Sequence, residues 1–343
     1  MKLLLAVLLA SLAAQAESPV PRASLKLRQE VPVILQAGPS FAQHRCDSQG
    51  NIYVRMLTDS KNPGRSVLSK IGGDGKVRAT FDPVIKEIGS EGTARDFAVL
   101  SDGSVSTLMG ANDAFYLVRY APNGKLGSTT RLSFGRDLGP HQLIPIGGRQ
   151  MLLLGEKITR ESEKKQTSEP ITALINANGD LERYLDTKEA FKVDAKGNVT
   201  EEEMSELANS QTVTDEAGTV YIMRRTAPTR IIAFTGAGEY LRTYNVEVPE
   251  PGYVPLNILA NGGKLAITYI EITEDDGVTK QAQAARLTRI VDQQSGLVMI
   301  DYIAPPEAKS TMDCYIAPDQ FLQLGQRDGR LTLLKMGDAV SSR

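Results

Sequence analysis

The stretch Cys46-Asp-Ser-Gln-Gly-Asn-Ile-Tyr-Val54 (CDSQGNIYV) joins a tight turn to a short run with the composition of a β-strand. The same form returns as Thr214-Asp-Glu-Ala-Gly-Thr-Val-Tyr-Ile222 (TDEAGTVYI), and Leu100-Ser-Asp-Gly-Ser-Val105 is a shorter version. Glycine and aspartate supply the backbone conformations that tight hairpins need. Because one turn-and-strand unit keeps returning, the sequence indicates a repeat architecture.

Strand-like runs follow such turns six times. They are Asn51–Met56, Ser104–Met109, Gln150–Leu154, Thr219–Met223, Lys264–Tyr269 and Gln320–Leu324. A second turn follows downstream in five units, as in Asp74-Gly75-Lys76 and Asn123-Gly124-Lys125, with an apolar strand on each side. Each unit therefore reads as four antiparallel strands at a spacing of roughly 45 residues, which is one propeller blade. A β-sandwich would not need two turn types in fixed alternation.

The two ends of the chain complete each other in this scheme. The sixth unit ends after its third strand, Arg330–Met336, while an apolar strand at Glu30–Gln36 precedes the first unit. We therefore predict an all-β fold, a six-bladed β-propeller of four-stranded antiparallel blades, whose N-terminal strand completes the last blade. Pro32 suits an outer strand, because such a strand tolerates a missing donor on its solvent side.

The first residues have the features of a targeting segment. Lys2 precedes an apolar run, and Ala14-Gln15-Ala16 is a small-x-small cleavage site. We predict a signal peptide at 1–16, a flexible segment at 17–29, the propeller at 30–337 and a C-terminal tail at 338–343. The apolar run is short for a membrane span, and an uncleaved anchor is the alternative. The expected product is an exported monomer, periplasmic or extracellular, with no membrane span after signal cleavage.

Composition limits the function classes. The formal net charge is −2 and tryptophan is absent, so a nucleic-acid partner is disfavoured. Two cysteines and two histidines leave no room for a cysteine-rich zinc site. In the predicted ring, Cys46 lies in the innermost strand of the first blade and Cys314 in that of the last. They would either form a disulfide that links the first blade to the last and so closes the ring, or remain two buried thiols.

The repeated motifs resemble those of six-bladed NHL-type and TolB-like propellers of exported bacterial proteins. The resemblance rests on the D-x-x-G-x-hydrophobic-Tyr-hydrophobic turns at 47–54 and 215–222, and on the turns at 123–125 and 74–76. It covers residues 30–337, although the third and fifth units lack the upstream aspartate. It implies a fold shared by protein- and RNA-binding modules, lyases and lactonases, and thus says little about function.

Polar residues recur where the innermost strands begin. Aligning the turns places six candidates near one channel mouth, with a one-residue slip in the last two: Gln43, Asp96, Gln142, Gln211, Asn257 and Asp313. His44, beside Gln43, is the seventh candidate. Such a ring could bind a small polar ligand or a divalent cation, calcium above all, because hard cations take several oxygen ligands. The alternative is a solvated wall without a ligand.

Three segments interrupt the repeat. The charged segments 156–169 and 271–283 are predicted as equivalent loops between second and third strands, and 201–208 as a short helix capped by Thr200. No Ser lies in a G-x-S-x-G elbow. We therefore expect a non-catalytic module that binds or scaffolds a protein or peptide. The alternative is a metal-assisted hydrolase or lyase of the lactonase type, whose Glu-Asn-Asp cluster would be matched only by Asn257, Asp313 and Asp96.

Overall fold

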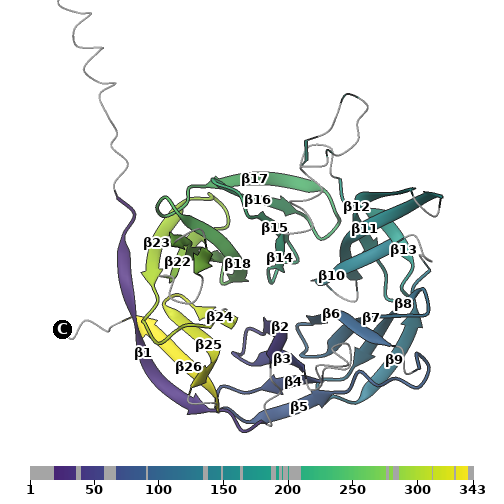
Figure 1. Cartoon of the computed structure of the whole chain (residues 1–343), viewed down its shortest axis with the longest axis horizontal. Coiled ribbons are helices and arrows are strands. Elements are labelled where there is room, and N and C mark those ends of the chain that lie inside the picture. Colours follow the sequence, from purple (N-terminus) through teal and green to yellow (C-terminus); the bar gives the residue numbers. More distant parts are fainter. Residues whose placement is uncertain are drawn as a thin grey trace, which may run out of the picture.

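The computed structural model describes residues 19–338, apart from 36–39, 58–66, 90–91, 134–137, 148–149, 163–164, 187–190, 193–194, 196–199, 201–209, 276–277, 281–285, 311 and 328–329. Every regular element in this part of the chain is a β-strand. The sheets stand around a central space, with innermost strands facing that space and other strands at the rim (Figure 1). The fold is therefore all-β and propeller-like, as predicted. The predicted signal peptide, the predicted helix at 201–208 and residues 339–343 of the predicted tail lie outside the described residues, while Asp338 ends the last strand.

Four of the sheets have four antiparallel strands each, in chain order from the centre outward. The first two are β2 (Ser40–Cys46), β3 (Ile52–Leu57), β4 (Leu68–Ile71), β5 (Val77–Phe81), then β6 (Thr93–Val99), β7 (Val105–Ala111), β8 (Ala114–Tyr120), β9 (Leu126–Arg131). The next two are β10 (Leu138–Gly147), β11 (Gln150–Ser162), β12 (Lys165–Ile175), β13 (Leu181–Tyr184), then β14 (Gln211–Thr214), β15 (Val220–Arg224), β16 (Thr229–Phe234), β17 (Tyr240–Val246).

A fifth sheet has eight strands and contains both ends of the described chain. Its order is β18 (Tyr253–Asn261), β19 (Lys264–Glu271), β22 (Arg286–Asp292), β23 (Val298–Ile303), β1 (Arg22–Pro32), β26 (Arg330–Asp338), β25 (Gln320–Arg327) and β24 (Met312–Ala317). β1 pairs antiparallel with β26 over most of its length and parallel with β23 at its start. The predicted pairing of the N-terminal strand with the last strands is therefore confirmed.

The N-terminal strand begins earlier than the sequence indicated. It starts at Arg22 rather than Glu30, so part of the segment predicted as flexible lies in the sheet. Arg22 contributes to this position, since its guanidinium is 2.6 Å from the carboxylate of Glu250 and 3.7 Å from that of the buried Asp301. These contacts connect the first strand to the outer strand β23 and to the segment before β18.

The two predicted charged loops are also partly strands. β11 and β12 stay paired as far as Ser162 and Lys165, so the insertion at 156–169 is an extended hairpin. At 271–283, β20 (Thr273–Asp275) and β21 (Val278–Lys280) form a small hairpin of their own. The sequence prediction of loops was wrong there, because these charged segments lack the alternation of apolar and polar residues that indicates a strand.

An aspartate carboxylate fixes each of the recurrent turns at 46–54 and 214–222. Asp47 accepts hydrogen bonds from the N–H groups of Gln49 and Asn51 at 3.0 and 2.9 Å, and from the Tyr53 hydroxyl at 3.2 Å. Asp215 likewise caps its own turn and accepts the Tyr221 hydroxyl at 3.1 Å. The aspartate therefore fixes the turn and accepts the hydroxyl of a buried tyrosine, the second residue of the strand that follows.

The second turn requires glycine for a different reason. Gly124 has φ +86°, and a Cβ there would lie 2.1 Å from the carbonyl oxygen of Thr80 in the neighbouring sheet. A side chain is therefore excluded by backbone conformation and by space together. This contact brings the outer turn of one sheet against the rim of the previous one.

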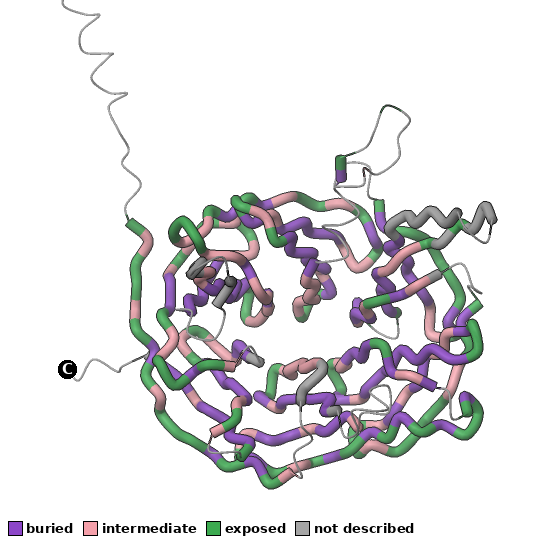
Figure 2. The backbone as a smooth tube through the Cα atoms, in the orientation of Figure 1, coloured by how far each residue is buried: buried purple, intermediate pink, exposed green. Residues whose placement is uncertain are grey.

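The core is divided among the junctions between neighbouring sheets. Six apolar clusters occur in the described residues: five lie between neighbouring sheets, among them the cluster around Leu322 and Leu333 between the eight-stranded sheet and the first sheet, and the sixth, around Tyr302 and Phe321, lies within the eight-stranded sheet. Buried stretches follow the middle of the sheets, while exposed ones lie at the rim (Figure 2). The innermost strands contact each other in the closed cycle β2-β6-β10-β14-β18-β24. Hydrophobic burial thus holds the ring together sheet against sheet.

Candidate functional site

Four of the seven polar residues predicted from sequence occupy equivalent positions in their strands. In β2, β6, β10 and β18 the ladder shifts by one residue just before Gln43, Asp96, Gln142 and Asn257, respectively. A β-bulge of this kind redirects the side chain that follows it. These four residues therefore follow the same local distortion of the innermost strand, and their role in binding a ligand stays a prediction.

Two of the glutamines in the ring connect neighbouring sheets. The Gln43 amide donates to the carbonyl oxygen of Arg95 at 3.1 Å, and the Gln142 amide donates to that of Ser210 at 3.0 Å. Each acceptor is the residue just before the ring position of the next sheet. Gln43 and Gln142 thus make the same contact in two places, which gives them a structural role in the ring.

Asp96 is the most buried acid of the ring, with 1% of its surface exposed. Both of its carboxylate oxygens are 3.2 Å from the Arg45 guanidinium, and one accepts the N–H of Leu143 at 2.7 Å. Arg45 also lies over the ring of Phe97, at 5.6 Å. Asp96 therefore joins its own sheet to the sheets on both sides.

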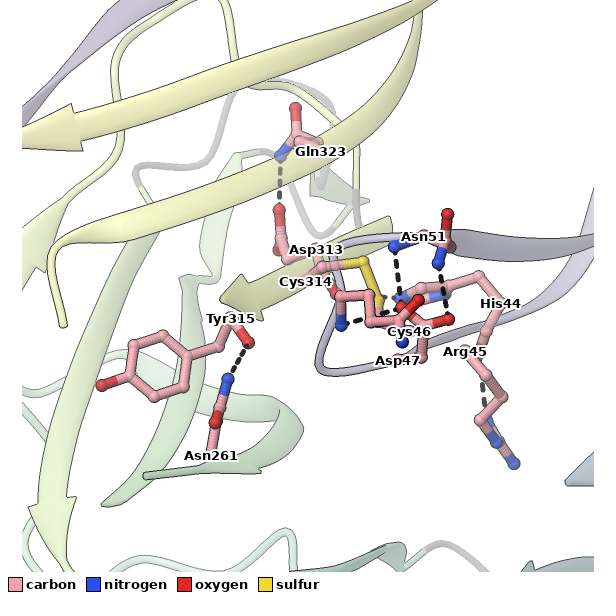
Figure 3. The surroundings of a disulfide bond; sticks show 11 residues. His44, Arg45, Cys46, Asp47, Asn51, Asn261, Asp313, Cys314, Tyr315 and Gln323 are labelled. Carbon is pink, nitrogen blue, oxygen red and sulfur yellow. Dashed lines mark hydrogen bonds between the residues drawn. A yellow bond between two sulfur atoms is a disulfide. The ribbon is translucent and has the colours of Figure 1, made fainter. Parts of the chain in front are cut away.

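His44 and the two cysteines lie where the first and last sheets meet. Cys46 and Cys314 form a disulfide, with Cα atoms 5.8 Å apart, so the predicted staple is present (Figure 3). His44 Nε2 lies 3.2 Å from the Asp313 carbonyl oxygen, which makes it the donor. Burial lowers the pKa of His44 to about 4, and the Arg45 charge acts in the same direction, while the hydrogen bond opposes them.

The remaining ring residues do not converge on one point. Asn257 accepts the N–H of Ile258, and Gln211 is half-buried at the start of β14. His141, which precedes Gln142 and is not one of the seven candidates, is exposed, and its Nε2 lies 3.8 Å from the Glu156 carboxylate. Among the described residues, no three His, Cys, Asp or Glu side chains are grouped so that they could share a metal ion. The predicted calcium site and the predicted ligand site at the channel stay predictions.

A pocket lies elsewhere, over β25 and β26, and its volume is about 440 Å³. That volume falls within the range of ligand sites, ~300–1,000 Å³. One wall is the segment between β23 and β24, and the other is the face of the last two strands. The lining residues are Glu307, Lys309, Ser310, Gln323, Gly325, Gln326, Arg327, Thr332 and Leu334. They offer both charges, amide and hydroxyl groups, and one apolar side chain.

A buried polar network fixes the wall of this pocket. Gln323 accepts the N–H of Ser310 at 3.2 Å and donates to the Ser310 carbonyl oxygen at 2.9 Å. It also donates to the Asp313 carboxylate at 2.6 Å (Figure 3). Arg286 lies 3.7 Å from the Asp313 carboxylate and donates to the carbonyl oxygen of Ala308 at 3.5 Å. The wall is therefore held on both sides of Lys309.

Asp313 is the centre of this network rather than a group open to the channel. Burial raises the pKa of its carboxyl group, while the Arg286 charge and the Gln323 hydrogen bond oppose that rise. Asp313 thus connects the predicted ring to the pocket, because Gln323 both binds its carboxylate and lines the pocket.

The sequence pointed to none of the pocket residues. The strongest signal that could have done so is Gly325, which interrupts the apolar run of β25. A strand glycine often marks a place where a ligand or another chain segment comes close. A Cβ at Gly325 would meet Ser310 Cβ at 3.7 Å, an ordinary contact, so the missing side chain leaves space in the pocket.

Comparisons with known proteins give no family. No protein-family model matches the chain, and no curated protein matches it. Among solved structures, the chain is similar to BBS1N in complex with ARL6DN (TM-score 0.45, 10% identity, covering 94% of this chain and 99% of that chain). It is also similar to YCF48 bound to a D1 peptide (0.42, 10%, 94% and 99%) and to PQQ-bound aldose sugar dehydrogenase from Streptomyces coelicolor (0.42, 10%, 93% and 99%). Scores this low support no inference about function.

No helix among the described residues is long and apolar enough to cross a membrane.

Proposed function

We propose that this chain is an exported binding module, built on a six-bladed propeller, which holds a segment of a protein or peptide in the pocket over β25 and β26. Two features support the blade count. Six innermost strands contact each other in a closed cycle, and the eight-stranded sheet divides at the β1–β23 pairing into two units of four strands. The candidate signal peptide supports export.

The observation that carries the binding function is the pocket together with its fixed wall. Recognition is favoured when the binding groups are already in place, because less conformational entropy is lost on association. Here Gln323 and Arg286 hold the backbone on either side of Lys309. A lining with amides, hydroxyls and both charges matches the groups that a peptide presents, and Leu334 adds an apolar contact.

The direct test is a peptide-display selection against the mature chain, residues 17–343. The pocket-filled variant Gly325→Leu serves for counter-selection, and Gly73→Leu is the matched control, because nothing lies within 4 Å of a Cβ at Gly73. We expect peptides that bind the wild type and Gly73→Leu at least ten-fold more tightly than Gly325→Leu. If no selected peptide distinguishes the two variants, the pocket is not the binding site.

A further inference from the structure

The disulfide and the wall of the pocket are connected through one residue, Asp313. We propose that the oxidation state of the bond between Cys46 and Cys314 controls the pocket, so that reduction loosens its wall and weakens peptide binding. The proposal rests on the proposed function and describes how the same site would be regulated.

The disulfide fixes the backbone of β24 against β2, two strands that belong to different sheets and are not paired with each other. Cys314 is fully buried in the apolar cluster between the eight-stranded sheet and the first sheet, and Cys46 is half-buried. The carbonyl oxygen of Asp313 lies 3.7 Å from Cys46 Sγ and 3.2 Å from His44 Nε2 (Figure 3). The first sheet therefore holds β24 at Asp313 as well as at the bond itself.

Breaking the bond forces the two sulfur atoms apart, because non-bonded atoms need more room than bonded ones. Cys314 has 0% of its surface exposed, and close-packed interiors pass such a displacement on to their surroundings. The neighbouring Asp313 is the residue that this displacement reaches first along the chain. The His44 hydrogen bond and the pairing of β1 with β26 remain, so the change is local and the ring stays closed.

Both contacts that fix the pocket wall pass through Asp313. Its carboxylate accepts the Gln323 amide at 2.6 Å, and the same amide group binds the N–H and the carbonyl oxygen of Ser310. The carboxylate also lies 3.7 Å from Arg286, which donates to the Ala308 carbonyl oxygen. A displaced Asp313 would therefore release the wall at two points.

The reductant is a dithiol, and the exposure of the two sulfur atoms determines the order of the steps. One thiolate of the dithiol attacks Cys46 Sγ, because Cys314 is buried. The S–S bond breaks, and Cys314 leaves with the electron pair as a thiolate and takes up a proton. The second thiolate attacks the reductant sulfur of the mixed disulfide, so that Cys46 is released and protonated. Two electrons and two protons thus pass from the dithiol, which becomes a disulfide, to the protein.

The looser wall should bind a peptide more weakly, since association would then have to order it. Couplings between two sites typically change an affinity by about 5- to 150-fold. We expect the lower end, ~5- to 10-fold, because the ladder between β25 and β26 is unaffected. By linkage, a bound peptide should oppose reduction by the same factor.

The first test needs no peptide. Hydrogen exchange of the mature wild-type chain would be followed by NMR before and after reduction with dithiothreitol. The Ser310 N–H, which Gln323 accepts, should exchange at least ten-fold faster after reduction. The Gly238 N–H, bound to the Thr235 carbonyl oxygen in a turn of another sheet, is the matched control and should exchange at an unchanged rate.

The second test measures affinity with a fluorescent peptide from the display selection. The oxidised wild type should bind it at least five-fold more tightly than the reduced wild type. The double variant Cys46→Ala with Cys314→Ala should bind like the reduced wild type and should not respond to dithiothreitol.

Three results would overturn the proposal. An unchanged exchange rate at Ser310 would show that the bond does not hold the wall. Equal affinity of the two oxidation states would show that the bond does not control binding, and a double variant that responds to dithiothreitol would show that the reagent acts elsewhere. Failure of the proposed function is distinct, since then no selected peptide responds to Gly325→Leu in the oxidised chain.

Discussion

Removing the disulfide between the first and last sheets should destabilise the fold by an amount that its position predicts. Cys46 and Cys314 are separated by 268 residues, so the bond closes a loop of most of the chain. A loop of this length restricts the unfolded chain by an entropy that corresponds to about 5–6 kcal/mol at 25 °C in the chain-entropy model. Measured effects are usually smaller, so we expect a loss of about 2–5 kcal/mol for Cys46→Ala with Cys314→Ala.

The assay is urea denaturation of the oxidised wild type, both single variants and the double variant. Each single variant should lose nearly the whole amount, because either one removes the cross-link, and the double variant should lose little more. The m-value should rise, since an unfolded chain without the cross-link exposes more surface. The variants should still fold, because the pairing of β1 with β26 closes the ring without the bond.

Two results would refute this reasoning. A loss below about 1 kcal/mol with an unchanged m-value would show that the bond does not restrict the unfolded chain. Single-variant losses that simply add in the double variant would show that the cysteines act through separate packing contacts. Thiol reduction of the wild type is the control, because it breaks the bond and keeps the sulfur atoms.

Three further predictions follow from buried polar contacts. The pKa of His44 is about 4 in the folded protein and near 6.5 in the unfolded chain. Between these two values the unfolded chain binds a proton that the folded protein does not. The free energy of unfolding should therefore fall by on the order of 2–3 kcal/mol as the pH is lowered from 6.5 to 4. Urea denaturation of His44→Gln across this range should show a decrease that is smaller by this amount. Asp96→Ala removes the partner of Arg45 and the acceptor of the Leu143 N–H, so it should lower the free energy of unfolding by about 2–3 kcal/mol in the same assay. A loss below about 0.5 kcal/mol would contradict the role of Asp96 in joining the three sheets. Tyr221→Phe deletes the hydroxyl bound by Asp215 and should cost about 0.5–1.5 kcal/mol, whereas Tyr116→Phe, a tyrosine outside the motif, should cost less.

The strands were predictable because their signals are local. In each motif the aspartate and the tyrosine lie six residues apart in the chain, as in Asp47 with Tyr53 and Asp215 with Tyr221. Their hydrogen bond connects the turn to the start of the following strand. The same local pattern located the start of all six second strands within one residue, and β11, β19 and β25 begin at the predicted residues Gln150, Lys264 and Gln320. Closure by the N-terminal strand followed from counting strands, since an incomplete last unit needs a partner.

The sites were less predictable because they depend on contacts between distant segments. The turn alignment located Gln43 and Gln142, but nothing local indicates that their amides bind the carbonyl oxygens of the next sheet. The pocket is harder still to foresee. Its wall depends on Arg286, Asp313 and Gln323, which lie in three strands and meet only after the sheets have packed.

The most direct test of the central claim, that a peptide binds over β25 and β26, is one comparison of affinities. A fluorescent peptide from the display selection would be titrated with the wild type, Gly325→Leu and Gly73→Leu, and its anisotropy measured. The account predicts at least ten-fold weaker binding to Gly325→Leu and binding within two-fold of the wild type for Gly73→Leu. Equal affinity for all three proteins would contradict it and would place the binding surface elsewhere on the ring.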